Sequence, residues 1–163
     1  QGQWAEARES LQAALAIHRE LKNTYNMAFA LLNLGSIARE QGRIDDAVRD
    51  LASARAHFRG FNSRVAEGHA WLELGACHLA RGDQEAGLRA LDTGEALLSG
   101  VAPAMQVEGL CRRVELAAAY GLADDAAEAL RRARAAADGL TNDAAASAQR
   151  VLSRAQRALA GAH

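Results

Sequence analysis

The sequence predicts an all-α protein, folded as an α-α superhelix in which antiparallel helix pairs are stacked in a row. Alanine and leucine together exceed a third of the 163 residues, and there is a single proline. β-Branched and aromatic residues, which strands favour, are scarce. Several columns of residues also recur about every 40 positions, which is typical of repeat proteins and not of one compact globule.

The repeat is visible in columns that keep the same register. Each unit has a glycine in its middle and a leucine nine positions later. The glycines are Gly2, Gly42, Gly82 and Gly121, and the leucines are Leu11, Leu51, Leu91 and Leu130. Because the columns agree with one another, we predict a single repeat domain over residues 1–163. It comprises a half repeat at 1–22, helix-pair repeats at 23–60, 61–100 and 101–139, and a capping helix at 140–163.

The half repeat at 1–22 opens at Gly2, the position of the turn inside a unit, so its first helix is missing. An apolar helix face would then be unburied. We expect either that this chain is a piece of a longer protein or that self-association covers the face. In repeat 23–60, Asn23 is placed to cap the first helix, and Gly42 to end it, since glycine adopts positive φ without a steric penalty.

Asp45 and Asp46 open the second helix of that repeat, where acids favour the positive end of the helix dipole. The later repeats have helix-start and helix-end residues at the equivalent positions. Their markers are Ser63, Gly82, Asp83 and Glu85, and then Pro103, Gly121, Asp124 and Asp125. The capping helix carries an apolar stripe beside a row of arginines. The stripe is Ala148, Val151, Leu152, Ala155 and Leu159, and the arginines are Arg150, Arg154 and Arg157.

Gly35 and Gly75 fall inside helices, where glycine costs about 1 kcal/mol relative to alanine. Close approach of a neighbouring helix would compensate for this cost. We therefore expect small residues of the second helices to pack against them, namely Ala47, Gly87 and Ala126. The large aromatic side chains Trp4, Trp71, Phe58 and Phe61 fall at core or turn positions, where burial is expected.

The run Trp71-x2-Leu74-Gly75-x2-His78 and the pairs Ala7-x3-Leu11, Ala47-x3-Leu51 and Gly87-x3-Leu91 resemble the tetratricopeptide repeat motif. The 40-residue period is longer than the usual 34. In this the chain is similar to the long-repeat members, such as the kinesin light chain and bacterial signalling and transcriptional regulators. The resemblance implies a concave groove, lined by the first helix of each pair, that binds a protein or peptide.

The resemblance also implies which residues face the groove. They are Phe29, Leu32, Asn33, Ser36, Arg39, His69, Leu72, Glu73, Ala76, Arg112, Arg113 and Leu116. Asn33 matches the position at which family members use asparagine to bond a ligand backbone. Arg112 and Arg113 would suit an acidic peptide, because guanidinium groups bind carboxylates in a bidentate manner.

Catalytic, metal and cofactor motifs are not found in the sequence. The five histidines are scattered, and there is no H-E-x-x-H, P-loop or G-x-S-x-G. The formal net charge of −1 speaks against direct nucleic-acid binding, and no apolar run could span a membrane. Cys77 and Cys111 are interpreted as small buried hydrophobes. The absence of a leader motif makes a cytoplasmic location the default expectation.

The sequence thus predicts a binding module and not an enzyme, without cofactors, as part of a larger bacterial regulatory protein. Its partner would be a protein or peptide, with an acidic one favoured by the arginines. Two alternatives stay open. One is the small-ligand sensor arm of a transcriptional regulator, with an apolar site around Phe29, Leu32 and Leu72. The other is a dimerisation module that associates through the open half repeat.

Overall fold

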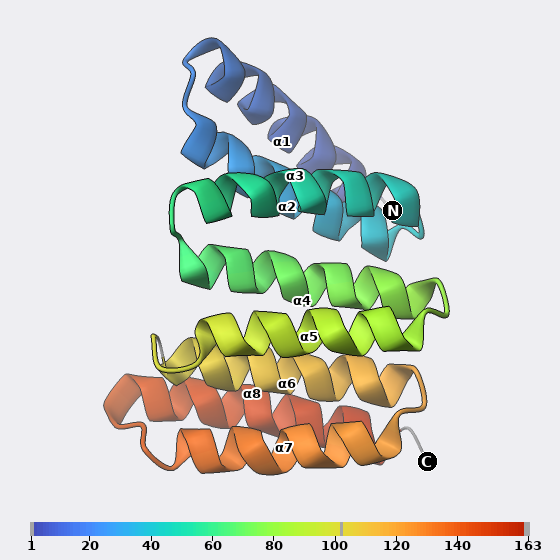
Figure 1. Cartoon of the computed structure of the whole chain (residues 1–163), viewed down its shortest axis with the longest axis vertical. Helices are drawn as coiled ribbons and strands as arrows, with labels where there is room; N and C mark the ends of the chain where they lie inside the picture. The colour runs from blue at the N-terminus through green and yellow to red at the C-terminus, as the bar shows by residue number, and fades with distance from the viewer. Residues whose placement is uncertain (1, 102, 162–163) are drawn as a thin grey trace. The chain divides into compact units, whose positions relative to one another are not determined.

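The computed structural model describes residues 2–101 and 103–161, and within them every regular element is an α-helix (Figure 1). The helices follow one another along the chain with short turns between them. They are α1 (Gly2–Glu20), α2 (Thr24–Glu40), α3 (Ile44–Gly60), α4 (Arg64–Ala80), α5 (Gln84–Leu98), α6 (Pro103–Ala119), α7 (Ala123–Ala137) and α8 (Asn142–Ala160). The all-α prediction is confirmed, and the packing of helices in adjacent pairs is consistent with the predicted superhelix.

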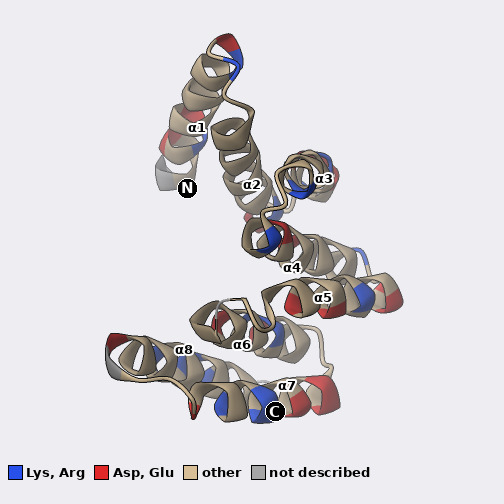
Figure 2. Cartoon of the chain, turned by 60° about the vertical axis from the view of Figure 1, so that its left-hand side comes forward, with Lys and Arg blue, Asp and Glu red and all other residues tan. Residues whose placement is uncertain are grey.

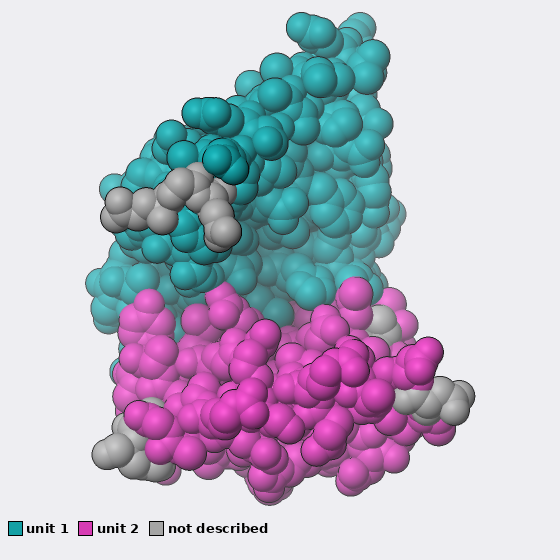
Figure 3. Space-filling view, turned by 180° about the vertical axis from the view of Figure 1, so that it is seen from behind, with its two compact units in different colours: residues 1–90 teal, residues 91–163 magenta. Residues whose placement is uncertain are grey.

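The chain divides into two compact units, residues 1–90 and 91–163 (Figure 3). The boundary falls inside α5. In unit 1, α2 packs against α1 and α3, and α4 packs against α3 and touches α2. In unit 2, α6 packs against both α7 and α8, which also contact each other. Each unit is described below by itself.

The predicted helix ends and N-caps are confirmed at several turns. Gly42, Gly82 and Gly121 have φ values of +74°, +80° and +74°, in the left-handed region that glycine adopts without strain. The Asn23 side chain caps α2 by accepting a hydrogen bond from the Asn26 amide at 3.1 Å. Ser63 is also an N-cap residue, although its side chain makes no capping bond. These signals are local, which explains why the sequence alone predicts them.

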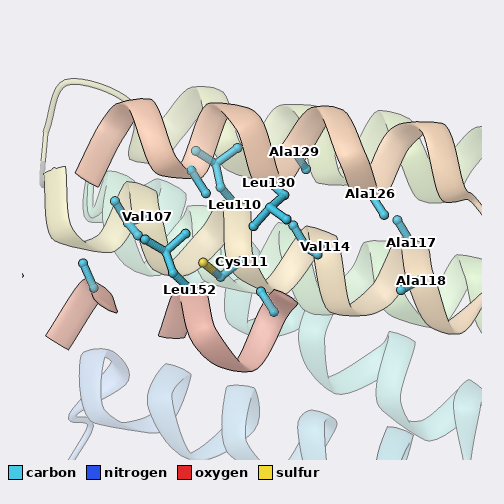
Figure 4. Packing of buried hydrophobic residues seen from close by; sticks show 13 residues of the cluster. Val107, Leu110, Cys111, Val114, Ala117, Ala118, Ala126, Ala129, Leu130 and Leu152 are labelled. Carbon is cyan, nitrogen blue, oxygen red and sulfur yellow. The ribbon is translucent and has the colours of Figure 1, made fainter. Parts of the chain in front are cut away.

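Unit 2 has a core made mostly of small side chains (Figure 4). From α6, Val107, Leu110, Cys111 and Val114 point into it. From α7 and α8 come Ala126, Ala129, Leu130, Ala133, Ala148, Leu152 and Ala155. Because alanine adds little beyond the backbone, the helices can lie close together and still exclude water. This is the role that the alanine-rich composition predicts.

In unit 1 the large aromatic side chains follow the predictions only in part. Phe58 is fully buried and packs with Ala28, Leu31 and Ala54. Trp71 is half-buried beneath the Arg55 guanidinium, which lies 4.4 Å from the ring centroid. Phe61 and Trp4 are 48% and 46% exposed, so their predicted burial is wrong. Phe61 occupies a turn, and Trp4 lies in the first turns of α1, which packs against α2.

The mid-helix glycines lie where neighbouring helices come closest, as predicted. A Cβ at Gly35 would stand 2.6 Å from Leu51 Cγ and 3.2 Å from the Ala47 carbonyl oxygen. At the equivalent contact between α4 and α5, a Cβ at Gly87 would stand 3.3 Å from the Gly75 carbonyl oxygen. Real Cβ atoms essentially never stand within 3.0 Å of such an atom, and contacts of 3.2–3.3 Å are tighter than nine in ten of theirs. Glycine therefore favours the close approach of α3 to α2 and of α5 to α4.

We predict that Gly35→Ala lowers the free energy of unfolding by about 1–2 kcal/mol, because overpacking outweighs the better helix propensity of alanine. Gly60→Ala is the matched control, since a Cβ there meets nothing within 4 Å. We expect that control to be neutral or stabilising by up to about 1 kcal/mol. Urea unfolding followed by circular dichroism measures both, and equal midpoints for the two variants would contradict the close-approach explanation.

Candidate functional site

The exposed face of α2 is the part of unit 1 best suited to hold a ligand. From Thr24 to Ala38 this helix contains no charged residue, and Figure 2 shows it without blue or red over that length. Ala28, Leu31, Leu34 and Gly35 point inward and are buried, whereas Tyr25, Phe29 and Asn33 are exposed and Ser36 is half-buried. These four residues are three or four positions apart and therefore share one face.

Aromatic rings gather at the N-terminal end of this face. The Tyr25 centroid lies 5.2 Å from that of Phe29 and 5.3 Å from that of Phe61, with the ring planes at 75° and 88°. The buried Phe58 ring supports them from below, 4.8 Å from Phe29. Edge-to-face contacts at these distances are favourable and hold the rings in place. Tyr25, Phe29 and Phe61, all partly exposed, form an apolar surface that we call the aromatic patch.

An ion pair marks the other end of the face. Arg39 Nε donates to Glu73 Oε2 at 3.0 Å, which links α2 to α4, and Arg39 Nη2 donates to Glu40 Oε1 at 2.6 Å. Burial disfavours the charged form of Arg39, but the two carboxylates outweigh it and raise its pKa above the ordinary value. The predicted groove residues Arg39 and Glu73 are thus brought together, and each engages the other.

Between these ends the predicted residues divide into accessible and buried groups. Asn33 is exposed, and Leu32 and His69 are half-buried. Ser36 donates its hydroxyl hydrogen to the Leu32 carbonyl at 3.1 Å, which leaves the oxygen as an acceptor. Leu72 and Ala76 of α4 are buried, so they contribute packing and not contact surface.

The predicted site residues of unit 2 are mostly engaged within the protein. Arg112 Nη1 lies 3.6 Å from Glu115 Oε2, and Glu115 also accepts a hydrogen bond from Arg154 of α8. Leu116 is buried. The Arg154–Glu115 contact joins α6 to α8, and the pairing of Arg112 with Glu115 within α6 leaves Arg112 a smaller role in ligand binding than the sequence suggested.

Arg113 requires a correction, because it is a structural residue and not an open receptor for an acidic peptide. Its side chain is only 8% exposed. The guanidinium donates to Asp125 of α7 at 2.9 and 2.5 Å, and to Asp92 and Glu95 of α5 at 2.5 and 3.3 Å. Arg132 completes this group by pairing with Glu95 at 2.8 Å. We call the five residues the Arg113 network.

The electrostatics of the Arg113 network reflect its burial. Burial disfavours the charged guanidinium of Arg113, but hydrogen bonds to Asp125 and Asp92 outweigh that effect and raise its pKa. Burial also raises the pKa of Glu95, and the neighbouring Arg113 and Arg132 counteract it only in part. The charges of this network are mutually satisfied, so its chemistry is that of a clamp between α5, α6 and α7.

The described residues were compared with two common features of enzyme sites, a metal cluster and a reactive thiol. No group of three or more His, Cys, Asp or Glu in residues 2–101 and 103–161 is placed to hold a metal ion. Cys77 and Cys111 are buried thiols, and burial raises the pKa of each to about 11, which disfavours the reactive thiolate. No helix in the described part of the chain is long and apolar enough to cross a bilayer.

A comparison with known protein families finds a match in the N-terminal part of the chain. The family model described as "Tetratricopeptide repeat" matches residues 1–60, which contain α1, α2 and α3. Residues 1–60 are therefore similar to tetratricopeptide repeats. The resemblance predicted from the sequence is confirmed there, and the later helices are consistent with tetratricopeptide-type repeats. No curated protein is similar enough to the chain to be matched. Tetratricopeptide repeats generally act as protein-interaction scaffolds, so the match suggests protein binding as the coarse functional class.

Sequence reasoning missed two groups of residues. Tyr25 and Phe61 were not assigned to the site, although Tyr25 stands four positions before Phe29, a spacing that brings side chains together on a helix. The second group is the acidic part of the Arg113 network. Asp92 and Glu95 precede Arg113 by 21 and 18 positions, and no local pattern connects them. Only tertiary packing reveals that contact.

Proposed function

We propose that this chain is a binding scaffold that holds a peptide segment of a partner protein against the exposed face of α2 and the adjoining edge of α4. One observation carries the proposal. An uncharged helix face exposes an aromatic patch and an unobstructed amide side chain in the segment that matches the tetratricopeptide family. The wider context that we propose is a larger bacterial regulatory protein, which the sequence resemblance suggests, in the cytoplasm.

The two ends of the face suit different parts of a peptide. An apolar side chain can pack on Phe29 and Tyr25, whose rings are already held by Phe58 and so lose little freedom on binding. The Asn33 amide can both donate to and accept from a peptide backbone. Partly buried aromatic residues beside a polar group are common among the residues that dominate binding energy.

We expect Phe29→Ala and Asn33→Ala each to weaken binding of a selected peptide about tenfold or more, which corresponds to about 1.4 kcal/mol. The peptides would be selected from a random displayed library on the purified chain, and Kd would be measured by calorimetry. Arg49→Ala is the control, because its side chain is 67% exposed on α3. Thermal unfolding of each variant checks that the fold is retained.

The decisive comparison is between Asn33→Ala and the control. Asn33 is exposed, so its truncation affects contacts with a peptide and not the core. If a selected peptide has the same Kd for the Asn33→Ala, Phe29→Ala and Arg49→Ala variants, the α2 face is not the binding surface.

A further inference from the structure

The last helix, α8, presents a face that is in register with the helix-packing faces of unit 1. The N-cap residues Asn23, Ser63 and Thr141 begin α2, α4 and α8. Twelve positions after each N-cap lie Gly35, Gly75 and Ser153. In unit 1 this is the place where the second helix of a pair comes close, with Ala47 and Leu51 against Gly35. Ser153 is therefore the corresponding contact position on α8, and we call the surface around it the seat for a second helix.

This seat is open on α8 within the described part of the chain. There α8 packs against α6 and α7 through Ala148, Leu152 and Ala155, which are buried. A shallow hollow of about 580 Å³ lies on another side of the helix. Its lining residues are Ala146, Gln149, Arg150, Ser153 and Arg157. The small residues Ala146 and Ser153 leave the space that a second helix axis needs.

The chemistry of the seat differs from that of its counterparts. Counting from the N-cap, Gln149 stands where α2 has Leu31, and Arg150 stands where α2 has Leu32. Polar and charged side chains thus replace the apolar ones that receive a second helix in unit 1. The face is shaped for a helix, but its side chains favour a polar, charged occupant.

Beyond Asp143, in the first turn of α8, the charge on this face has one sign. From Ala144 to Gly161 there are three arginines and no acidic residue, and Figure 2 shows the blue of arginines along α8. Arg154 is engaged with Glu115. Arg150 and Arg157 are exposed and line the hollow. They are seven residues apart, which corresponds to about 10.5 Å along a helix axis, and they point to the same side.

We propose that this face of α8 docks an acidic helix of a partner protein. Two carboxylates of that helix, two turns apart, pair with Arg150 and Arg157, since both helices have the same rise per residue. Ala146 and Ser153 let the helix axes approach, and the Gln149 amide bonds polar groups at the edge. This surface is separate from the α2 face, and it would give the scaffold a second partner site.

A pair of fluorescent, alanine-rich helical peptides of about 20 residues tests the charge requirement. One peptide carries two glutamates seven positions apart, and the other carries glutamines there. We expect the glutamate peptide to bind at least tenfold more tightly, as measured by fluorescence anisotropy at low salt. Phe29→Ala leaves this affinity unchanged, which separates the proposal from that made for the α2 face.

Variants of the chain test the location. The double variant Arg150→Glu/Arg157→Glu should lower the affinity for the glutamate peptide at least tenfold and bind a lysine version of the peptide instead. Ser153→Phe fills the hollow without changing charge and should also weaken binding. The charge-matched control is Arg49→Glu/Arg131→Glu, whose arginines are 67% and 76% exposed elsewhere.

Three outcomes would overturn the proposal. The first is equal binding of the glutamate and glutamine peptides. The second is an equal loss of affinity in the control and in the Arg150/Arg157 variant. The third is a concentration-dependent dimer of the chain alone that Ser153→Phe abolishes in sedimentation, because the occupant would then be a second copy and not an acidic partner helix.

Discussion

Replacing Arg113 with methionine is expected to lower the free energy of unfolding by about 3–5 kcal/mol. The substitution keeps an apolar stem in place but removes the guanidinium from between Asp125, Asp92 and Glu95. Glu95 is then left buried with Arg132 as its ion-pair partner. A buried carboxylate that loses one of its two cationic partners is costly, so the clamp between α5, α6 and α7 is weakened. Urea unfolding followed by circular dichroism measures the loss.

Two comparisons show whether the loss of stability comes from the Arg113 network or from the removal of any arginine charge. Arg131→Met removes a guanidinium that is 76% exposed, so its expected cost is below about 1 kcal/mol. The double variant Arg113→Met/Glu95→Leu should regain part of the stability lost in Arg113→Met, because it removes the buried charge together with its partner. A double variant that is less stable than Arg113→Met would contradict our account of the Arg113 network.

Phe58→Ala is expected to lower the free energy of unfolding by about 3–5 kcal/mol, because it empties the largest fully buried side-chain position among the described residues. Phe58 supports Tyr25 and Phe29 of the aromatic patch and packs with the alanines of α2 and α3. Its loss should therefore lower the thermal unfolding temperature of the chain and also weaken peptide binding to the α2 face.

Phe61→Ala is the matched comparison for this prediction. Phe61 belongs to the same aromatic cluster, but it is 48% exposed, so the cavity left behind is open to water. We expect less than half the cost of Phe58→Ala, as measured by thermal unfolding. Equal costs would show that edge-to-face contacts, and not burial, stabilise this end of unit 1.

The sequence predicts the helices well because their signals are local. Gly42, Gly82 and Gly121 end helices at positive φ, and Asn23 caps one, and each of these roles depends on a few neighbouring residues. The close approach at Gly35 was also predictable, since a glycine that recurs inside a helix must be compensated by packing. The 40-residue register aligned each glycine with its small counterpart on the next helix.

The candidate site was less predictable, because accessibility depends on what packs against each face. Register placed Phe29, Asn33 and Arg113 alike on first helices, and the structure separates them. Phe29 and Asn33 are exposed, whereas Arg113 lies among carboxylates from two other helices. A guanidinium in a sequence does not reveal whether water, a ligand or a neighbouring carboxylate surrounds it.

By itself the sequence determined the class of this protein, an all-α stack of helix pairs with turns at defined glycines, because helix propensity, capping and periodicity act over short distances. The tertiary structure alone decided which side chains are free to meet a partner. Long-range contacts bury Arg113 and Leu116, gather Tyr25, Phe29 and Phe61, and leave Arg150 and Arg157 exposed on α8. Burial is a property of packed helices, and no local pattern contains it.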